Sequence, residues 1–227
     1  MTACVTDKTS WKQICSFKLN TKYRKYRQDM VMSRASMYAF NEEELEMIDR
    51  RSTSLQVNVK DVFDKTTVMS TALINAHALN DDFQRDVKNF FGSFEGCLIR
   101  QGPVKALQRC TAKAESDYSA QPFPTTCCII DLIRGSVTFD DLKTYIDALT
   151  DFVRTVYDGS ESKKVFSVIS GIMRCKNGFS KYNGDDAAAI PDRYCDIKLN
   201  IVCKNAAMKF AIVGMFVCQC VSVHVRV

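Results

Sequence analysis

The sequence predicts an α+β protein whose mixed β-sheet is flanked by helices and preceded by a helical N-terminal extension. Two observations carry this prediction. Helical periodicity dominates the first half of the 227-residue chain, whereas short apolar or alternating runs dominate the second half. One strongly amphipathic segment lies among these runs, so the second half has the order strand, helix, strand, strand, strand.

Helices are predicted throughout the first half of the chain. Asn41 and Glu44 have the spacing of a capping box, in which side chains satisfy free N–H groups of the first turn. From Met69 to Phe91, apolar residues recur at steps of three, four and seven, which predicts a helix. Gly92–Gly102 is predicted as a break, and Lys105–Tyr118 as a further helix.

The second half begins with an apolar run, Cys127–Ile133, bounded by Pro124 and Gly135. This run predicts a buried strand that includes Ile129–Leu132. Three further strands are predicted, the second of which alternates strictly between apolar and polar residues: Val165–Arg174, Tyr194–Cys203 and Phe210–Val225, the last being a strand or a hairpin.

An amphipathic helix is predicted over Asp140–Tyr157, with Asp140 as its N-cap. Its apolar residues recur at helical spacing and are Leu142, Tyr145, Ile146, Leu149, Phe152, Val153 and Val156. We expect this helix to pack on one face of the sheet.

The composition excludes several classes of protein. Hydrophobic residues make up 46% and charged residues 25%, which are ordinary globular values and exclude a disordered tail or a coiled coil. The most apolar stretch, Phe210–Val223, is too short to span a bilayer. Residues 1–12 contain no apolar signal core. These features predict a soluble, cytoplasmic protein with no membrane span.

The chain contains 11 cysteines. An odd count without a secretion signal favours reduced thiols over a disulfide framework. Cys218, Cys220 and His224 have the spacing closest to a metal site, but they supply three ligands where a closed zinc site needs four. Buried free cysteines that act as small apolar side chains are therefore the favoured interpretation.

The net charge of +5 is concentrated at the N-terminus. Residues 1–40 contain eight Lys and Arg against two Asp, a net charge of +6, which leaves −1 for residues 41–227. Within this basic arm, Lys22–Arg27 interleaves tyrosines with cations, as contacts with nucleic acids or anionic surfaces do. A solvated helix face is the alternative interpretation.

Lys105, Arg109 and Lys113 lie at four-residue steps, which places three cations on one helix face. Like charges in this arrangement repel one another unless an anion lies against them. A polyphosphate would supply that anion, and a plain solvated face is the alternative.

Further polar residues are predicted to lie near these cations. Asp131 and Arg134 come at the end of the apolar run, where a carboxylate beside a cationic helix is suited to hold Mg²⁺ on a triphosphate. Arg174 and Lys176 project from the same face of a strand and could bind further phosphates. Tyr194, on the polar face of the next strand, could stack on a base.

Four segments occur in an order that is familiar from one family: Gly102–Tyr118 (GPVKALQRCTAKAESDY), Ile130–Val137 (IDLIRGSV), Met173–Phe179 (MRCKNGF) and Arg193–Asn200 (RYCDIKLN). Together they resemble the RelA/SpoT-type nucleotidyltransferase fold, the (p)ppGpp synthetase superfamily. The likeness is to a divergent branch with strands of the form D-[IL]-[IV]-R and G-Y-R-D-[IV]-x-L-N. It covers roughly residues 100–225, so we expect a basic arm and helical region over 1–95 and a nucleotidyltransferase domain over 96–227.

The resemblance implies transfer of pyrophosphate from ATP to the 3′-hydroxyl of GDP or GTP, with these purine nucleotides as partners and Mg²⁺ as cofactor. It implies that Asp131 binds Mg²⁺ and that Tyr194 stacks on the acceptor guanine. Arg109 and Lys113 would hold the ATP phosphates, and the full nucleotide-binding set would be Lys105, Arg109, Lys113, Arg134, Arg174, Lys176 and Tyr194. Positioning and cationic stabilisation are most of what phosphoryl chemistry requires.

The chain departs from the family pattern in its final strand and at Arg193, Cys195 and Lys198. The final strand of the family carries Glu-x-Gln, and aligning Phe216–Val221 with it puts Gln219 in place of the Glu that activates the acceptor hydroxyl. A neutral amide cannot accept that proton, and general-base catalysis contributes about 10²–10⁴-fold. Asp196 is an alternative candidate for this general base. Arg193 replaces a Gly, and Lys198 replaces a His of the strongest synthetases.

Three hypotheses about function therefore remain open. The first is a nucleotide pyrophosphokinase, active or weakened. The second is a non-catalytic nucleotide-binding or protein-interaction module that retains the fold. The third is an RNA-associated module that uses the basic arm.

Because the chain has two histidines in all, the histidine–aspartate metal site of bifunctional family members is excluded.

Overall fold

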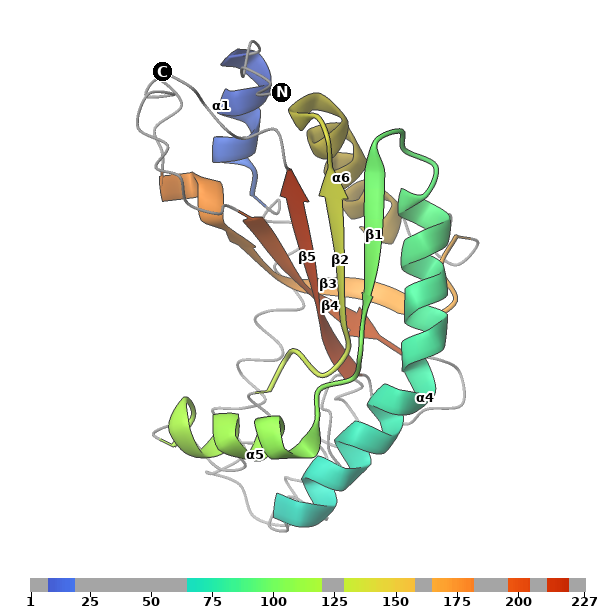
Figure 1. The fold of residues 1–227 in the computed structure, drawn as a ribbon, viewed down its shortest axis with the longest axis vertical. Helices are drawn as coiled ribbons and strands as arrows, with labels where there is room; N and C mark the ends of the chain where they lie inside the picture. The colour runs from blue at the N-terminus through green and yellow to red at the C-terminus, as the bar shows by residue number, and fades with distance from the viewer. Residues whose placement is uncertain are drawn as a thin grey trace.

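The computed structural model describes residues 8–18, 65–119, 129–157, 165–181, 196–204 and 212–220. The predicted α+β class is confirmed, because these residues form a mixed sheet with the strand order β1-β2-β5-β4-β3 and flanking helices (Figure 1). The strands are β1 (Cys97–Gly102), β2 (Arg134–Phe139), β3 (Ile169–Asn177), β4 (Asp196–Cys203) and β5 (Ile212–Cys220). The β2–β5 pair is parallel and the other three pairs are antiparallel.

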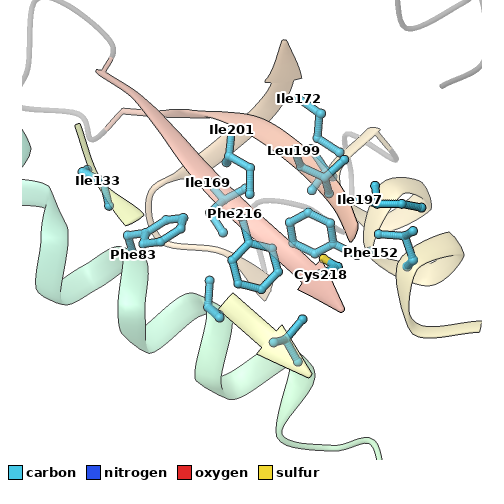
Figure 2. Close-up of a cluster of buried hydrophobic side chains, with 14 of the residues drawn as sticks. Phe83, Ile133, Phe152, Ile169, Ile172, Ile197, Leu199, Ile201, Phe216 and Cys218 are labelled. Carbon is cyan, nitrogen blue, oxygen red and sulfur yellow. The ribbon is translucent and has the colours of Figure 1, made fainter. Parts of the chain in front are cut away.

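The helices are α1 (Lys8–Ser16), α4 (Lys65–Phe91), α5 (Leu107–Ser116) and α6 (Leu142–Tyr157), with a 3₁₀ turn at Gly178–Lys181. Helices α4 and α6 cover the same face of the sheet. The ring of Phe216 on β5 stacks on Phe91 of α4 with a centroid distance of 5.1 Å, and lies 6.3 Å from Phe152 of α6. Figure 2 shows Phe83 and Phe152 reaching the sheet from these two helices and meeting the side chains of β3, β4 and β5.

Most of the predicted helices and strands are confirmed within the described residues. The helix predicted over Met69–Phe91 lies within α4, and the one over Lys105–Tyr118 contains α5. The strands predicted over Tyr194–Cys203 and Phe210–Val225 contain β4 and β5. The capping box at Asn41 lies outside the described residues, as does the basic segment 22–27.

The strand predicted over Ile129–Leu132 is wrong, because β2 begins only at Arg134. The apolar residues of this segment are buried, with Ile129 and Ile133 fully enclosed. However, the segment precedes β2 in the chain and is not paired in the sheet, and its backbone carbonyls accept hydrogen bonds from other parts of the molecule. One of these bonds joins the Lys105 N–H to the Leu132 carbonyl over 2.8 Å. Burial, and not pairing in the sheet, explains why the run is apolar.

The break predicted over Gly92–Gly102 is also wrong in part, because Cys97–Gly102 forms the edge strand β1. Strand β1 pairs with β2 alone in the described sheet, and its side chains are half-buried or exposed. Leu98 is 53% exposed, and Arg100 is exposed as well. An edge strand with so little burial lacks the apolar alternation by which a strand is found in a sequence.

The strand predicted over Val165–Arg174 is displaced, because β3 spans Ile169–Asn177. The displacement has a physical cause. Asp86 of α4 accepts hydrogen bonds from the backbone N–H groups of Ser167 and Val168, so these N–H groups do not bond to β4, and the ladder begins at Ile169. The buried carboxylate thus fixes where the strand begins.

The sequence predicted Asp140 as the N-cap of α6, but the structure shows that Asp141 is the N-cap. The Asp141 Oδ1 atom accepts hydrogen bonds from the N–H groups of Lys143 and Thr144, at 2.8 and 3.1 Å. Burial raises the pKa of the Asp141 carboxyl, but the hydrogen bond of the Thr144 side chain, these two backbone bonds and the charge of Lys143 outweigh burial and hold that pKa below its usual value.

The described cysteines are free thiols, and Cys218 and Cys220 are buried. Within the same residues no group of three or more His, Cys, Asp or Glu side chains could hold a metal ion, and His224 lies outside them. None of the described helices combines the length and apolarity needed to cross a membrane.

Candidate functional site

A hollow of about 460 Å³ lies at the end of the sheet where β1 ends and β2 and β5 begin. Helix α5 lies beneath this end of the sheet in Figure 1 and forms one wall of the hollow. Four cations and two carboxylates line it, giving a net positive wall. The lining residues are Lys105, Gln108, Arg109, Ala112, Lys113, Ser116, Asp117, Asp131 and Arg134.

The carboxylate of Asp131 is held by two lysines. The Lys105 Nζ atom donates to Asp131 Oδ1 over 3.0 Å and to Oδ2 over 2.9 Å, and Lys113 Nζ donates to Oδ2 over 3.1 Å. The Lys105 side chain is 8% exposed, that of Asp131 is 13% exposed, and that of Lys113 is 27% exposed. The ammonium of Lys105 is therefore enclosed, whereas that of Lys113 borders the open space.

The lysines determine the protonation state of this cluster. Burial raises the pKa of Asp131, but the hydrogen bonds and charges of Lys105 and Lys113 together outweigh burial and lower that pKa below its usual value. Burial lowers the pKa of Lys113, and the charge of Asp131 and the hydrogen bond to it outweigh this and raise the pKa. Asp131 and Lys113 are therefore both charged at neutral pH.

The backbone around Asp131 is fixed by three different parts of the chain: β4, β5 and Lys105, which precedes α5. The Asn200 side chain of β4 donates from Nδ2 to the Ile130 carbonyl over 2.9 Å. Beyond Asp131, the Leu132 carbonyl accepts the Lys105 N–H, and the next carbonyl accepts the Met215 N–H over 2.8 Å. Because the residues on both sides are pinned, the position of the Asp131 carboxylate is set by the fold.

Arg134 is placed by a second group of hydrogen bonds. Its guanidinium donates through Nε and Nη2 to the Pro103 carbonyl, at 3.2 and 3.1 Å. Gln84 of α4, which is buried, donates from Nε2 to the Arg134 carbonyl over 2.8 Å and to the Gly102 carbonyl over 3.2 Å. A Cβ atom at Gly102 would lie 2.6 Å from the Arg134 carbonyl oxygen, so this close approach requires glycine.

Sequence reasoning did not identify Gln84 or Asn200 as part of this site. Gln84 follows Phe83 on the helix whose apolar residues were interpreted as core. An amide side chain next to these apolar residues was the feature that could have indicated a role for Gln84. Asn200 lies on the polar face of an alternating strand, and that face is buried at this position as well. A linear pattern does not show which carbonyls such amides reach.

Arg109 extends from the exposed side of α5 and makes no ion pair with any other described residue. Its guanidinium is thus available at the hollow, together with the partly exposed ammonium of Lys113. A guanidinium can form two parallel hydrogen bonds to a phosphate group. Chemically, the hollow is suited to bind a multiply charged anion.

Arg174 and Lys176 do not line this hollow. Both are exposed on β3, the opposite edge of the sheet from β1. In the ladder, Arg174 pairs with Asn200, Asn200 with Met215, and Met215 with Arg134, so these residues share one face and one row of the sheet. Three strand spacings separate Arg174 from Arg134, which is about 14 Å. Tyr194 lies outside the described residues.

Gln219 also lies outside the hollow. It is four residues along β5 from Met215, about 13 Å in a strand. It pairs with Thr138 on one side and with Asp196 on the other, so the three side chains share one face. Asp196 is buried, and its Oδ2 atom lies 2.9 Å from the Nζ atom of Lys198. A carboxylate therefore lies directly opposite the amide.

The donor set of the hollow does not fit a Mg²⁺ ion held by the protein in this arrangement. An ionised carboxylate has about four lone-pair positions, and the two lysines occupy three of those on Asp131. Mg²⁺ requires near-octahedral oxygen ligands and is usually held by one or two carboxylates together with substrate phosphates. The role of Asp131 as a Mg²⁺ ligand stays a prediction.

No protein-family model matches the chain, and no curated protein matches it. Among solved structures, the chain is similar to a chain from the crystal structure of the complex between the Type VI effector Tas1 and its immunity protein. The sequence identity is 18% and the TM-score is 0.38, over 67% of this chain and 61% of that chain. The match thus spans about three fifths of the other chain, and a similarity this loose does not bear on function.

Proposed function

We propose that this protein binds purine nucleotides through their phosphates, and that it transfers pyrophosphate from ATP to the 3′-hydroxyl of GDP or GTP. The observation that carries the proposal is the group of four cations around one hollow. They come from three parts of the fold: Lys105 precedes α5, Arg109 and Lys113 lie on α5, and Arg134 begins β2.

The hollow suits the phosphate chain of ATP in size and charge. A volume of about 460 Å³ lies within the range of about 300–1,000 Å³ that is usual for small-molecule sites. Catalysis of phosphoryl transfer consists mainly of positioning and of stabilising negative charge. The sequence likeness to RelA/SpoT-type synthetases supports the same assignment for Arg109 and Lys113.

We assign the acceptor nucleotide to the face of the sheet that carries Arg174, Lys176 and Lys198. Lys176 and Lys198 pair directly in the ladder, and like charges in that position repel one another. Asp196 offsets Lys198, while Lys176 and Arg174 make no ion pair with any described residue. An anionic group over β3 and β4 would relieve this repulsion. Stacking of Tyr194 on the acceptor base remains part of the proposal.

A non-catalytic nucleotide-binding module is the second candidate function, and Gln219 favours it. A neutral amide at the position of the base lowers the expected rate by about 10²–10⁴-fold. Asp196 is the described carboxylate that faces Gln219 and could accept the proton in its place. The two candidates differ in turnover and not in binding.

The binding part of the proposal is tested by isothermal titration of the full chain with ATP and with GDP. Arg109→Gln is expected to weaken ATP binding by about 10–100-fold, because a charged hydrogen bond contributes about 1.5–3 kcal/mol. The matched control is Arg154→Gln on α6, an exposed helical arginine paired with Asp151 at 2.9 Å and remote from the hollow. The control should leave the dissociation constant unchanged.

Two results would refute this part. If the wild-type chain binds no purine nucleotide, the nucleotide proposal is wrong and an interaction scaffold remains. If Arg109→Gln binds ATP as tightly as wild type, the phosphate chain does not lie in the hollow.

The catalytic part is tested by following product formation from ATP and GDP. Gln219→Glu is expected to raise turnover if this position serves as the base, whereas Asp196→Asn should abolish it if Asp196 does. Absence of turnover in wild type and in Gln219→Glu, together with intact ATP binding, would establish the non-catalytic module.

A further inference from the structure

We propose that Asp131 is an internal anion of the hollow: it neutralises Lys113 in the free protein, and a phosphate group of a metal-free di- or triphosphate takes Lys113 from it. This inference rests on the proposed function and names the form in which the phosphate chain is bound. It reverses the role that the family resemblance implies for Asp131, since the carboxylate would hold lysines and not a metal ion.

The geometry of the cluster is that of an anion bound by two ammonium groups. The three contacts to the Asp131 oxygens measure 2.9 to 3.1 Å, the ordinary range of charge-assisted hydrogen bonds. A phosphate oxygen makes the same kind of contact with an ammonium group. A ligand phosphate and the Asp131 carboxylate would therefore compete for the same donors.

The two lysines differ in their freedom to move. Lys105 bonds to both carboxylate oxygens and its side chain is 8% exposed, so it has little room to turn. Lys113 bonds to one oxygen and its side chain is 27% exposed. Its Nζ atom also lies 5.6 Å from the centre of the Tyr118 ring. Lys113 is therefore the donor that a ligand can take over.

The Asp131 carboxylate does not move with Lys113. The carbonyls on both sides of Asp131 are bonded to Asn200 and to the Lys105 N–H, which fixes the backbone that carries the side chain. When Lys113 turns towards a ligand, Asp131 remains on Lys105. One ammonium thus keeps the carboxylate neutralised while the other binds the phosphate.

The same charges disfavour a divalent cation. A Mg²⁺ ion that approached Asp131 would meet two ammonium groups already within 3.1 Å of its oxygens. Arg109 and Arg134 on the walls add further positive charge. Charge in this hollow is complementary to a phosphate chain without a metal ion.

The experiment measures the affinity for inorganic pyrophosphate by isothermal titration, once with EDTA and once with excess Mg²⁺. Asp131→Asn is expected to tighten binding of metal-free pyrophosphate about tenfold, because it removes a competing negative charge a few ångströms from the ligand. The matched control is Asp117→Asn, which removes a carboxylate that lines the same hollow but makes no described contact with the Lys113 ammonium; its backbone N–H bond to the Lys113 carbonyl is kept. The control is expected to change the affinity by less than about twofold.

A second variant tests the role of Lys113. Lys113→Gln is expected to weaken binding of metal-free pyrophosphate about fivefold, and to remove most of the gain produced by Asp131→Asn in the double variant. Because Lys113→Gln leaves the bond between Asp131 and Lys105 in place, it stays informative if Asp131→Asn does not fold. Unchanged affinity in Lys113→Gln would overturn the inference.

The outcomes separate this inference from the proposed function. If wild type binds neither pyrophosphate nor ATP, both fail. If wild type binds ATP and Arg109→Gln does not, but Asp131→Asn weakens the Mg²⁺–pyrophosphate complex and leaves metal-free binding unchanged, Asp131 is a metal ligand. The inference is then wrong and the proposed function stands.

Discussion

Two carboxylates of this protein, the buried Asp86 and the less enclosed Asp131, are held in different ways. Asp86 of α4 is buried and accepts five hydrogen bonds, all from the consecutive residues Ser167, Val168 and Ile169. Four of these come from backbone N–H groups and one from a hydroxyl. Asp131 accepts three hydrogen bonds, all from lysine ammonium groups.

The difference between the donors separates an anchor from a binding site. Backbone N–H groups cannot leave Asp86 without moving the start of β3, so this carboxylate joins α4 to the sheet. An ammonium on a flexible side chain can exchange one anion for another without moving the backbone. Burial of a carboxylate therefore does not by itself indicate a binding site. What indicates one is that its hydrogen-bond donors can move without the backbone.

The largest effect is expected when the anchor is removed. Asp86→Ala removes the acceptor of the Ser167, Val168 and Ile169 N–H groups, and Val168 and Ile169 are buried. Each buried unsatisfied group costs about 1–3 kcal/mol, so we expect a loss of about 3–5 kcal/mol in the free energy of unfolding. Unfolding in urea measures this change.

Asp86→Asn serves as the control, because its amide retains one oxygen acceptor, and it should lose clearly less stability than Asp86→Ala. A loss below about 1 kcal/mol in Asp86→Ala would mean that Asp86 is not an anchor.

A smaller loss, about 2 kcal/mol, is expected for Asp131→Asn. It leaves the enclosed Lys105 ammonium without its counter-charge, but the cluster borders solvent, so the cost lies between those of buried and exposed pairs. Saturating pyrophosphate should restore much of this loss, whereas it should not restore the loss in Asp86→Asn. Thermal unfolding with and without pyrophosphate compares the two variants, and equal restoration in both would remove the distinction between anchor and site.

The pH dependence of stability gives a further comparison. The pKa of Asp131 is lower in the folded protein than its ordinary value of 3.8. Its contribution to stability is thus fully present above pH 3.8 and is lost as the pH falls through the folded-state pKa. The difference in unfolding free energy between wild type and Asp131→Asn should be constant near neutral pH and shrink below pH 3.8. A difference that grows on acidification would contradict the two-lysine arrangement.

A still smaller effect is expected for Lys113→Gln, about 0.5–1 kcal/mol in unfolding free energy, because this ammonium is partly exposed. Lys143→Gln on α6 is the comparison, since Lys143 pairs with Asp147 on an exposed helix face and should lose less, about 0.3–0.5 kcal/mol. Chemical unfolding of both variants tests the order. A loss in Lys113→Gln as large as that in Asp131→Asn would mean that Lys113 is held as firmly as Lys105.

The sequence predicted the fold class and most helices, because their apolar periodicity reflects the core directly. Phe83, Val87 and Phe91 follow the α4 stripe and are buried in the structure. Strand limits were predicted less well. The start of β3 depends on Asp86, a residue about 80 positions earlier in the chain, and β1 is an edge strand whose side chains are little buried.

The candidate site was predicted in part. Helical spacing predicted Lys105, Arg109 and Lys113 on one helix face. In the structure Lys105 precedes α5, but all three line the hollow together with Asp131 and Arg134. Linear spacing could not show that Arg174 lies about 14 Å from Arg134 across the strands, or that Gln219 lies about 13 Å from Met215 along β5. Nor could it show that the Asp131 oxygens are already bonded to two lysines.

The central claim, that the hollow beside α5 holds a phosphate chain, is tested most directly by a crystal structure of the full chain grown with ATP. The triphosphate is expected between α5 and Arg134, with phosphate oxygens within about 3 Å of the Lys113 ammonium and the Arg109 guanidinium. The Lys105 contact to Asp131 should be retained. A triphosphate bound elsewhere, with Lys113 still on Asp131, would contradict the account.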